Sequence, residues 1–111
     1  SKKDFLEYIL GSMPSAIIYL NTEKTVMLYN IVATKLLENE SLYGINIFEI
    51  MPDLEALLTE AEKAPDQIHN RTLETKINGK MKTFHLLAAL DFSKGEIRGF
   101  IINFLPVITT K

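Results

Sequence analysis

The chain has 111 residues and contains no cysteine; 47% of its residues are hydrophobic and 23% are charged. This length suits one domain with a buried core, and the lack of cysteine excludes a disulfide framework, a thiolate nucleophile and a cysteine zinc site in this chain. The formal net charge of −2 and the lack of a lysine- or arginine-rich run give no electrostatic attraction to nucleic acid.

The N-terminal part predicts a helix followed by two strands. Residues 1–13 hold an apolar stripe at helical spacing. The apolar runs 16–20 and 25–29 are typical of strands, and the polar stretch "NTEK" between them is typical of a turn. The stripe of the first helix is formed by Phe5, Leu6, Ile9 and Met13.

Asn30 stands where the second strand changes into a helix that begins at Ile31. The residues after it repeat with the 3.6-residue period of an amphipathic helix. Because an asparagine oxygen can accept a hydrogen bond from the first helical turn, we predict that Asn30 is an N-cap. The alternative is that its amide faces a ligand.

Two further helices are predicted in the middle of the chain. In "NIFEIMP", Asn46 can cap a one-turn helix, Glu49 stands three residues later and Pro52 ends it. Residues 53–64 then carry apolar residues at helical spacing, with Asp53 as the expected cap. These apolar residues are Leu54, Leu57, Leu58 and Ala61.

Acidic residues of this longer helix are not read as a site. Glu60 and Glu62 are assigned to its solvated side, where a bare charge is the normal state. Pro65 is expected to stop the helix.

The C-terminal part predicts three strands, the last at 97–105. Asn78-Gly79 is a strong hairpin signal because both residues tolerate positive φ, so Ile77 is expected to pair with Lys80 and Leu73 with Phe84. That register places Leu73, Thr75, Phe84, Leu86, Ala88 and Leu90 on one face, and Glu74, Lys76, Thr83, His85 and Leu87 on the other. Helices inserted between the strands must cover one face of the sheet, which predicts an α+β domain with five strands.

The order of these elements, and the residues at several points, resemble a PAS domain. The segments "ILGSMPSAIIYLNTEKTVMLYNIVATKLL", "LYGINIFEIMP" and "NGKMKTFHLLAAL…GEIRGFIINF" carry the resemblance, which covers essentially the whole chain. It implies a five-stranded antiparallel sheet in the order 2-1-5-4-3 with helices over one face. It also implies a sensory or dimerising role in a bacterial signalling protein. The lack of cysteine favours a cytoplasmic location, and no enzymatic activity is expected. In such a module, residues 1–13 are the N-terminal helix, 14–105 the PAS core and 106–111 the start of a linker to an output module, all excised from a longer chain.

Two positions depart from the family pattern. PAS domains that feed a downstream module often end in Asp-Ile-Thr, and Pro106 stands at the aspartate position here, followed by "VITT". The turn "NTEK" also lacks the glycine that is common there, so a different turn geometry is expected.

The family resemblance also bears on cofactors. Light-sensing LOV relatives bond flavin through a cysteine, so the lack of cysteine excludes that photochemistry. Haem-binding relatives usually take an axial histidine from the long helix, which holds none here. His69, just beyond that helix, is the remaining haem candidate, and the competing interpretation is a solvated loop histidine. His85 is predicted to lie on the surface, and no catalytic or metal-binding constellation is predicted.

The space between sheet and helices is the candidate pocket for a small apolar or aromatic ligand. Asn30, Thr75 and Asn103 are the polar groups that could orient a ligand there. The same apolar residues suit a plain core, because ligand pockets are also mostly apolar. The predicted lining is Ile18, Leu28, Leu37, Phe48, Leu58, Leu73, Phe84, Leu86 and Ile101.

Three functions are consistent with this sequence. The first is a PAS sensory module that binds a small ligand and controls a covalently linked histidine kinase or enhancer-binding transcription activator. The second is a ligand-free PAS module that only mediates dimerisation. The third is a small α+β enzyme, for which the sequence shows no acid–base-lined cleft.

We also expect a homodimer and no membrane insertion, since the longest apolar stretch is too short to span a bilayer. The dimer would form through Phe5, Leu6, Ile9 and Met13 of the N-terminal helix, beside an outer sheet face that carries Met81 and Leu87. The alternative is a monomer in which this helix folds onto its own sheet and buries the same residues.

Overall fold

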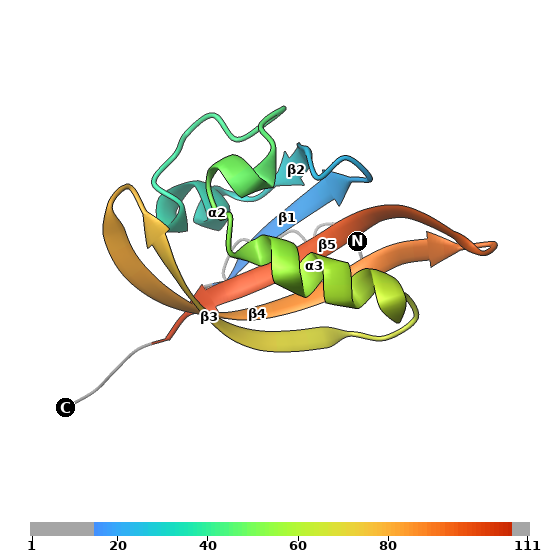
Figure 1. The fold of residues 1–111 in the computed structure, drawn as a ribbon. Coiled ribbons are helices and arrows are strands. Elements are labelled where there is room, and N and C mark those ends of the chain that lie inside the picture. Colours follow the sequence, from blue (N-terminus) through green and yellow to red (C-terminus); the bar gives the residue numbers. More distant parts are fainter. Residues whose placement is uncertain (1–14, 108–111) are drawn as a thin grey trace, which may run out of the picture.

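The computed structural model describes residues 15–107 of the chain (Figure 1). The predicted N-terminal helix, with its stripe of Phe5, Leu6, Ile9 and Met13, lies outside the described residues, as do residues 108–111 of the predicted linker. Pro106, at the position of the family's aspartate, is described and is the last residue of the final strand.

Five strands form one antiparallel sheet in the order β2-β1-β5-β4-β3, which confirms the predicted topology. The last strand of the chain is therefore the central strand of the sheet, with β1 on one side and β4 on the other. The strands are β1 (Ala16–Asn21), β2 (Val26–Tyr29), β3 (His69–Ile77), β4 (Lys80–Ser93) and β5 (Glu96–Pro106).

The helices lie over one face of this sheet (Figure 1), which we call the inner face, so the predicted α+β architecture is confirmed. They are α2 (Ile31–Leu36), the short 3-10 helix η1 (Ile47–Glu49) and α3 (Leu54–Lys63). Within residues 15–107, no helix combines the length and the apolar character that crossing a membrane requires.

Two of the three predicted helix caps are confirmed. The side-chain oxygen of Asn30 accepts a hydrogen bond from the backbone N–H of Ala33, and that of Asn46 accepts one from Phe48. The prediction for Asp53 is wrong, because its side chain makes no cap hydrogen bond. Its backbone is already helical, with φ −68° and ψ −11°, whereas a capping side chain needs an extended residue before the helix.

The β3–β4 hairpin has the predicted register. Ile77 pairs with Lys80 and Leu73 pairs with Phe84. Asn78 and Gly79 form the turn with φ of 50° and 80°, the conformation for which this residue pair is suited. The register places Phe84 on the inner face, where its ring meets that of Phe104 edge to face at a centroid distance of 5.3 Å.

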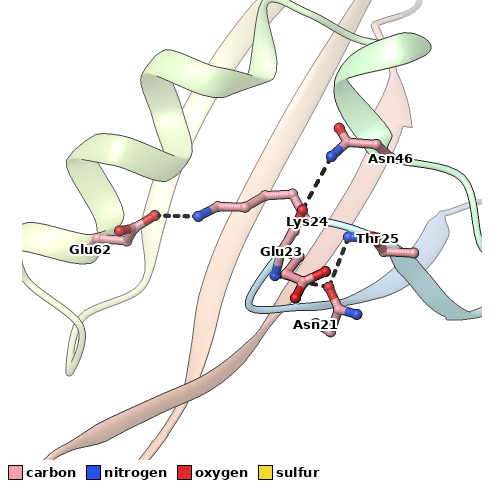
Figure 2. Close-up of polar contacts among 6 residues, drawn as sticks. All are labelled: Asn21, Glu23, Lys24, Thr25, Asn46 and Glu62. Carbon is pink, nitrogen blue, oxygen red and sulfur yellow. Dashed lines mark hydrogen bonds and ion pairs between the residues drawn. The ribbon is translucent and has the colours of Figure 1, made fainter.

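The turn between β1 and β2, which holds no glycine, has a lysine in a left-handed conformation. Lys24 has φ of 65°, a left-handed conformation that costs a residue with a Cβ atom roughly 1–2 kcal/mol. The turn is organised by Asn21, whose side-chain oxygen accepts hydrogen bonds from the N–H groups of Glu23 and Thr25 at 2.9 and 3.0 Å (Figure 2). The geometry thus keeps the left-handed residue without the glycine.

The face assignment of the hairpin can be tested by mutation. Phe84→Ala is expected to lower the free energy of unfolding by about 3–5 kcal/mol, because it opens a cavity beneath Phe104. The neighbouring His85→Ala should change it by about 0.5 kcal/mol, as exposed substitutions do. Urea denaturation of both variants measures the two values, and a larger loss for His85→Ala would contradict the register.

Candidate functional site

Most of the predicted pocket lining is packed as core. Ile18, Leu37, Leu58, Phe84 and Leu86 are each at most 2% exposed and belong to one continuous hydrophobic cluster, against which Phe48 and Leu73 pack at its edge. Five hollows in the surface formed by residues 15–107 are lined by residues other than Ile18, Leu58 and Phe84. These three side chains help to fill the space between sheet and helices.

Three of the predicted pocket residues lie on the opposite, outer face of the sheet. Two of them, Ile101 and Asn103, alternate along β5 with the buried Phe100, Ile102 and Phe104, so they point away from the helices. The prediction that they line an internal pocket is therefore wrong.

Leu28 is the third of these residues. It is 68% exposed because it stands directly opposite Tyr19 on β1, and residues paired across an antiparallel ladder share a face. An irregularity between Tyr19 and Leu20 changes the register of β2, and no residue pattern within 25–29 reveals it. The prediction that Leu28 lines an internal pocket is also wrong.

The Asn30 amide makes three hydrogen bonds within the chain. Its oxygen accepts hydrogen bonds from the backbone N–H groups of Ala33 and Ile17, and its nitrogen donates one to the carbonyl of Ser15, all at 3.1 Å. One side chain thus ties the start of β1 to the start of α2. This arrangement gives Asn30 a structural role and leaves little of its amide for a ligand.

Thr75 is the polar group of the inner face that lacks a partner. It is 1% exposed, and its hydroxyl makes no hydrogen bond. Within the described range, the Ser15 hydroxyl is the other buried side-chain group in this state. A buried polar group without a partner typically costs about 1–3 kcal/mol, so the Thr75 hydroxyl marks a point on the inner face where a hydrogen-bonding group would be stabilised.

The outer face of the sheet is apolar and solvent-exposed at its centre. Leu87 and Ile101 are each 41% exposed and Leu105 is 37% exposed. Leu87 and Leu105 border a shallow hollow of about 440 Å³ that also contains Asn103 and His85. His85 is on the surface, as predicted, and its Nδ1 lies 3.1 Å from the hydroxyl of Thr72.

Tyr19 of β1 and Asp91 of β4 form a hydrogen-bonded pair on this face. The Tyr19 hydroxyl donates a hydrogen bond to Asp91 Oδ2 at 2.8 Å, and this bond, together with burial, raises the pKa of Tyr19. Gly99 lies beneath the ring, where a Cβ atom would come within 2.4 Å of the Tyr19 hydroxyl. This pair could not be found from the sequence, because the two residues stand 72 positions apart and neither belongs to a local pattern.

The two acidic residues of α3 that were predicted to be bare are both paired. Glu62 Oε1 lies 3.0 Å from the Lys24 ammonium, and Glu60 forms an ion pair with Arg71 on β3. Helical periodicity could not reveal these partners, because both lie on distant segments of the chain.

A third ion pair joins Lys82 on β4 to Glu38 at 2.5 Å. The hydrogen bond from the Lys82 ammonium lowers the pKa of the Glu38 carboxyl. The same ammonium lies 3.4 Å from the carbonyl of Leu36 at the end of α2, so this pair fastens the end of that helix to the sheet.

His69 lies in strand β3 and is partly buried, so the interpretation as a solvated loop residue is wrong. Its Nε2 lies 3.0 Å from the carbonyl of Ala64 at the end of α3, a contact that links strand and helix. No cluster of three or more metal-ligating side chains occurs among residues 15–107.

Comparison with known proteins identifies the fold. No family model and no curated protein sequence matches the chain. The solved structures that resemble it over most of its length include three PAS domains. The PAS domain of a protein from Colwellia psychrerythraea has a TM-score of 0.77 at 9% identity, and the match covers 96% of this chain and 98% of that one.

The second, the PAS domain of nitrogen regulation protein NR(II) from Vibrio parahaemolyticus, has a TM-score of 0.76 at 15% identity, covering 92% of this chain and 97% of that one. The third, a PAS domain from a two-component sensor histidine kinase, has a TM-score of 0.70 at 15% identity, covering 96% of both chains. The chain therefore has the PAS fold, as the sequence resemblance predicted.

The three contacts of Asn30 can be separated by substitution. Asn30→Ala is expected to lower the free energy of unfolding by about 2 kcal/mol, because it removes a cap and also the partner of the Ile17 N–H and of the Ser15 carbonyl. Asn30→Asp keeps both accepted bonds but faces the Ser15 carbonyl with a carboxylate, so a loss of about 1 kcal/mol is expected. Asn70→Ala, a control at an exposed asparagine of β3, should stay within about 0.5 kcal/mol. An Asn30→Asp variant as stable as wild type in urea denaturation would show that the Ser15 contact contributes nothing.

Proposed function

We propose that this chain is the sensory or regulatory module of a larger signalling protein and that it works by self-association through the outer face of its sheet. The observation that carries this proposal is the exposure of Leu87, Ile101 and Leu105 on the sheet face that no described helix covers. Monomeric proteins rarely leave such a contiguous apolar surface open.

Residues 1–13, the predicted N-terminal helix, are the proposed occupant of this face. β1 begins beside the outer hollow, because Ile17 pairs with Asn103, which lines it. The segment before β1 carries the apolar stripe that includes Phe5 and Ile9. A helix of about a dozen residues is marginal in water and must dock on a surface to persist. We place it at the outer face of a two-fold homodimer, with Phe5 and Ile9 at or beside the interface.

The output is proposed to follow the last strand. Pro106 pairs with Phe84, and the N–H of Val107 donates to the carbonyl of Thr83 at 3.0 Å. The described chain therefore stays paired with β4 as far as Val107. Because one similar structure comes from a two-component sensor histidine kinase, we propose a linked kinase as the output, with an enhancer-binding transcription activator as the alternative.

Sedimentation equilibrium tests the association. The wild-type chain is expected to be a dimer at high micromolar concentration, and Ile9→Glu and Ile101→Glu should each weaken the dimer about tenfold or more, because each buries a charge at the interface. Ile68→Glu is the matched control, since Ile68 is 67% exposed but belongs to the loop before β3. A wild type that remains monomeric at these concentrations sinks the proposal, whereas a dimer that survives Ile101→Glu places the interface elsewhere.

A second candidate function, binding of a small ligand inside the domain, is favoured by the unpartnered Thr75 hydroxyl. A ligand there would be mostly apolar, to suit the surrounding core, and would carry one group that hydrogen-bonds to a hydroxyl. Because the side chains around this point are packed, such a ligand requires the core to open.

Native mass spectrometry of the protein purified from cells tests this candidate. A bound molecule should be released on denaturation, its occupancy should fall about tenfold in Thr75→Val, and Thr75→Ser should retain it. If the wild type shows only the mass of the bare chain, and Thr75→Val is as stable as wild type or gains up to about 1 kcal/mol, the site is a plain core position.

A further inference from the structure

Helix α3 is held over the sheet by one ion pair on each of its two flanks. Glu62 pairs with Lys24 of the β1–β2 turn, and Glu60 pairs with Arg71 of β3. Residues two positions apart on a helix point about 200° apart, so the two carboxylates necessarily reach in opposite directions. We call these two ion pairs the α3 clamp.

The ion pair of Lys24 and Glu62 lies beside the hydrophobic core. Figure 2 shows the side chain reaching from the turn to α3. Its ammonium lies 3.0 Å from Glu62 and 5.0 Å from the centre of the Phe100 ring, and Phe100 is a buried residue on the inner face of β5. The ammonium therefore joins helix and sheet at once, by an ion pair and by a cation–π contact.

The backbone at Lys24 is held by other contacts. Its carbonyl accepts a hydrogen bond from the N–H of Ile47 at 2.9 Å, and the Asn46 amide donates to the Glu23 carbonyl at 3.1 Å (Figure 2). The turn thus stays in place without the lysine side chain. The residue at this left-handed position is a lysine, where glycine would carry no steric cost, and its side chain contacts Glu62 and the Phe100 ring.

The four side chains of the α3 clamp are partly exposed to solvent, whereas the side of α3 that faces the sheet is buried. The side chains of Lys24 and Glu62 are 23% and 39% exposed, and those of Arg71 and Glu60 are 36% and 57% exposed. The inner side of α3 is fully buried through Leu54, Leu57, Leu58 and Ala61. Dissolved ions therefore weaken the fastening of the helix and leave its apolar packing intact.

We propose that α3 is a lid over the inner face of the sheet, held closed by the α3 clamp, and that ionic conditions regulate its opening. Opening at this place is what gives a small molecule access to the packed inner face. The proposal does not depend on the self-association proposed above, because the clamp and the outer sheet face lie on opposite sides of the sheet.

Amide hydrogen exchange of the whole chain, resolved by residue, tests this lid. In Glu60→Gln/Glu62→Gln, the amides of α3 are expected to exchange about tenfold or more faster than in wild type, and about three- to fivefold faster in each single variant. The amides of β4 and β5 serve as the internal reference and should not change. Glu38→Gln, which breaks the Lys82 ion pair instead, is the matched control and should leave α3 exchange as it is in wild type.

A change of salt concentration and the substitution Lys24→Gly provide two independent tests of the lid. Raising the salt from about 0.1 M to about 1 M shortens the screening length from about 10 Å to about 3 Å, so α3 exchange should rise in wild type and stay constant in the double variant. Lys24→Gly removes one half of the clamp and also the left-handed strain, so α3 should open more readily while the urea midpoint stays the same or rises. Two results overturn the proposal. One is an amide exchange rate of α3 that is the same in the double variant as in wild type. The other is an α3 rate that rises only together with the rates of β4 and β5.

Discussion

The pairing of β5 in the centre of the sheet is the constraint on which the rest of the structure depends. This strand is the last in sequence, yet it joins β1 to β4, and with it the two halves of the domain. Its alternation sends Phe100, Ile102 and Phe104 into the core and leaves Ile101 and Leu105 on the outer face. A shift of one residue would exchange these two sets, so the same hydrogen bonds fix both the core and the proposed association surface.

Features governed by local chemistry could be predicted from the sequence. Asn78-Gly79 sets the hairpin register because two residues with positive φ fit a two-residue turn. Asn30 is predictable as a cap because it precedes a helical stripe, and Asn46 because Glu49 follows three residues later. From those local elements the resemblance to PAS domains supplied the strand order, which no local rule contains. Asp53 shows the limit, since the residue type was right for a cap and only the backbone conformation decided against it.

The candidate site was less predictable because it depends on contacts between distant segments. Leu28 was assigned inward since alternation within a short strand does not say which face is inner, and its partner Tyr19 decides that. Glu60 and Glu62 looked like ordinary solvated acids because periodicity reports the face of a helix and not what stands beside it. In each case the missing information was the identity of a residue across the fold.

Lys24 and Ile101 show how the two faces of the domain meet. The Lys24 ammonium rests over the Phe100 ring on the inner face, and Ile101, the next residue of β5, lies on the outer face. Successive residues of a strand point to opposite sides of the sheet. If the proposed opening of α3 lets Phe100 move, the backbone that moves with it is the backbone that positions Ile101. Physical coupling between two sites requires an element that both of them bias. In this fold β5 is the segment that both faces share, because it carries Phe100 of the inner face and Ile101 of the outer face at adjacent positions.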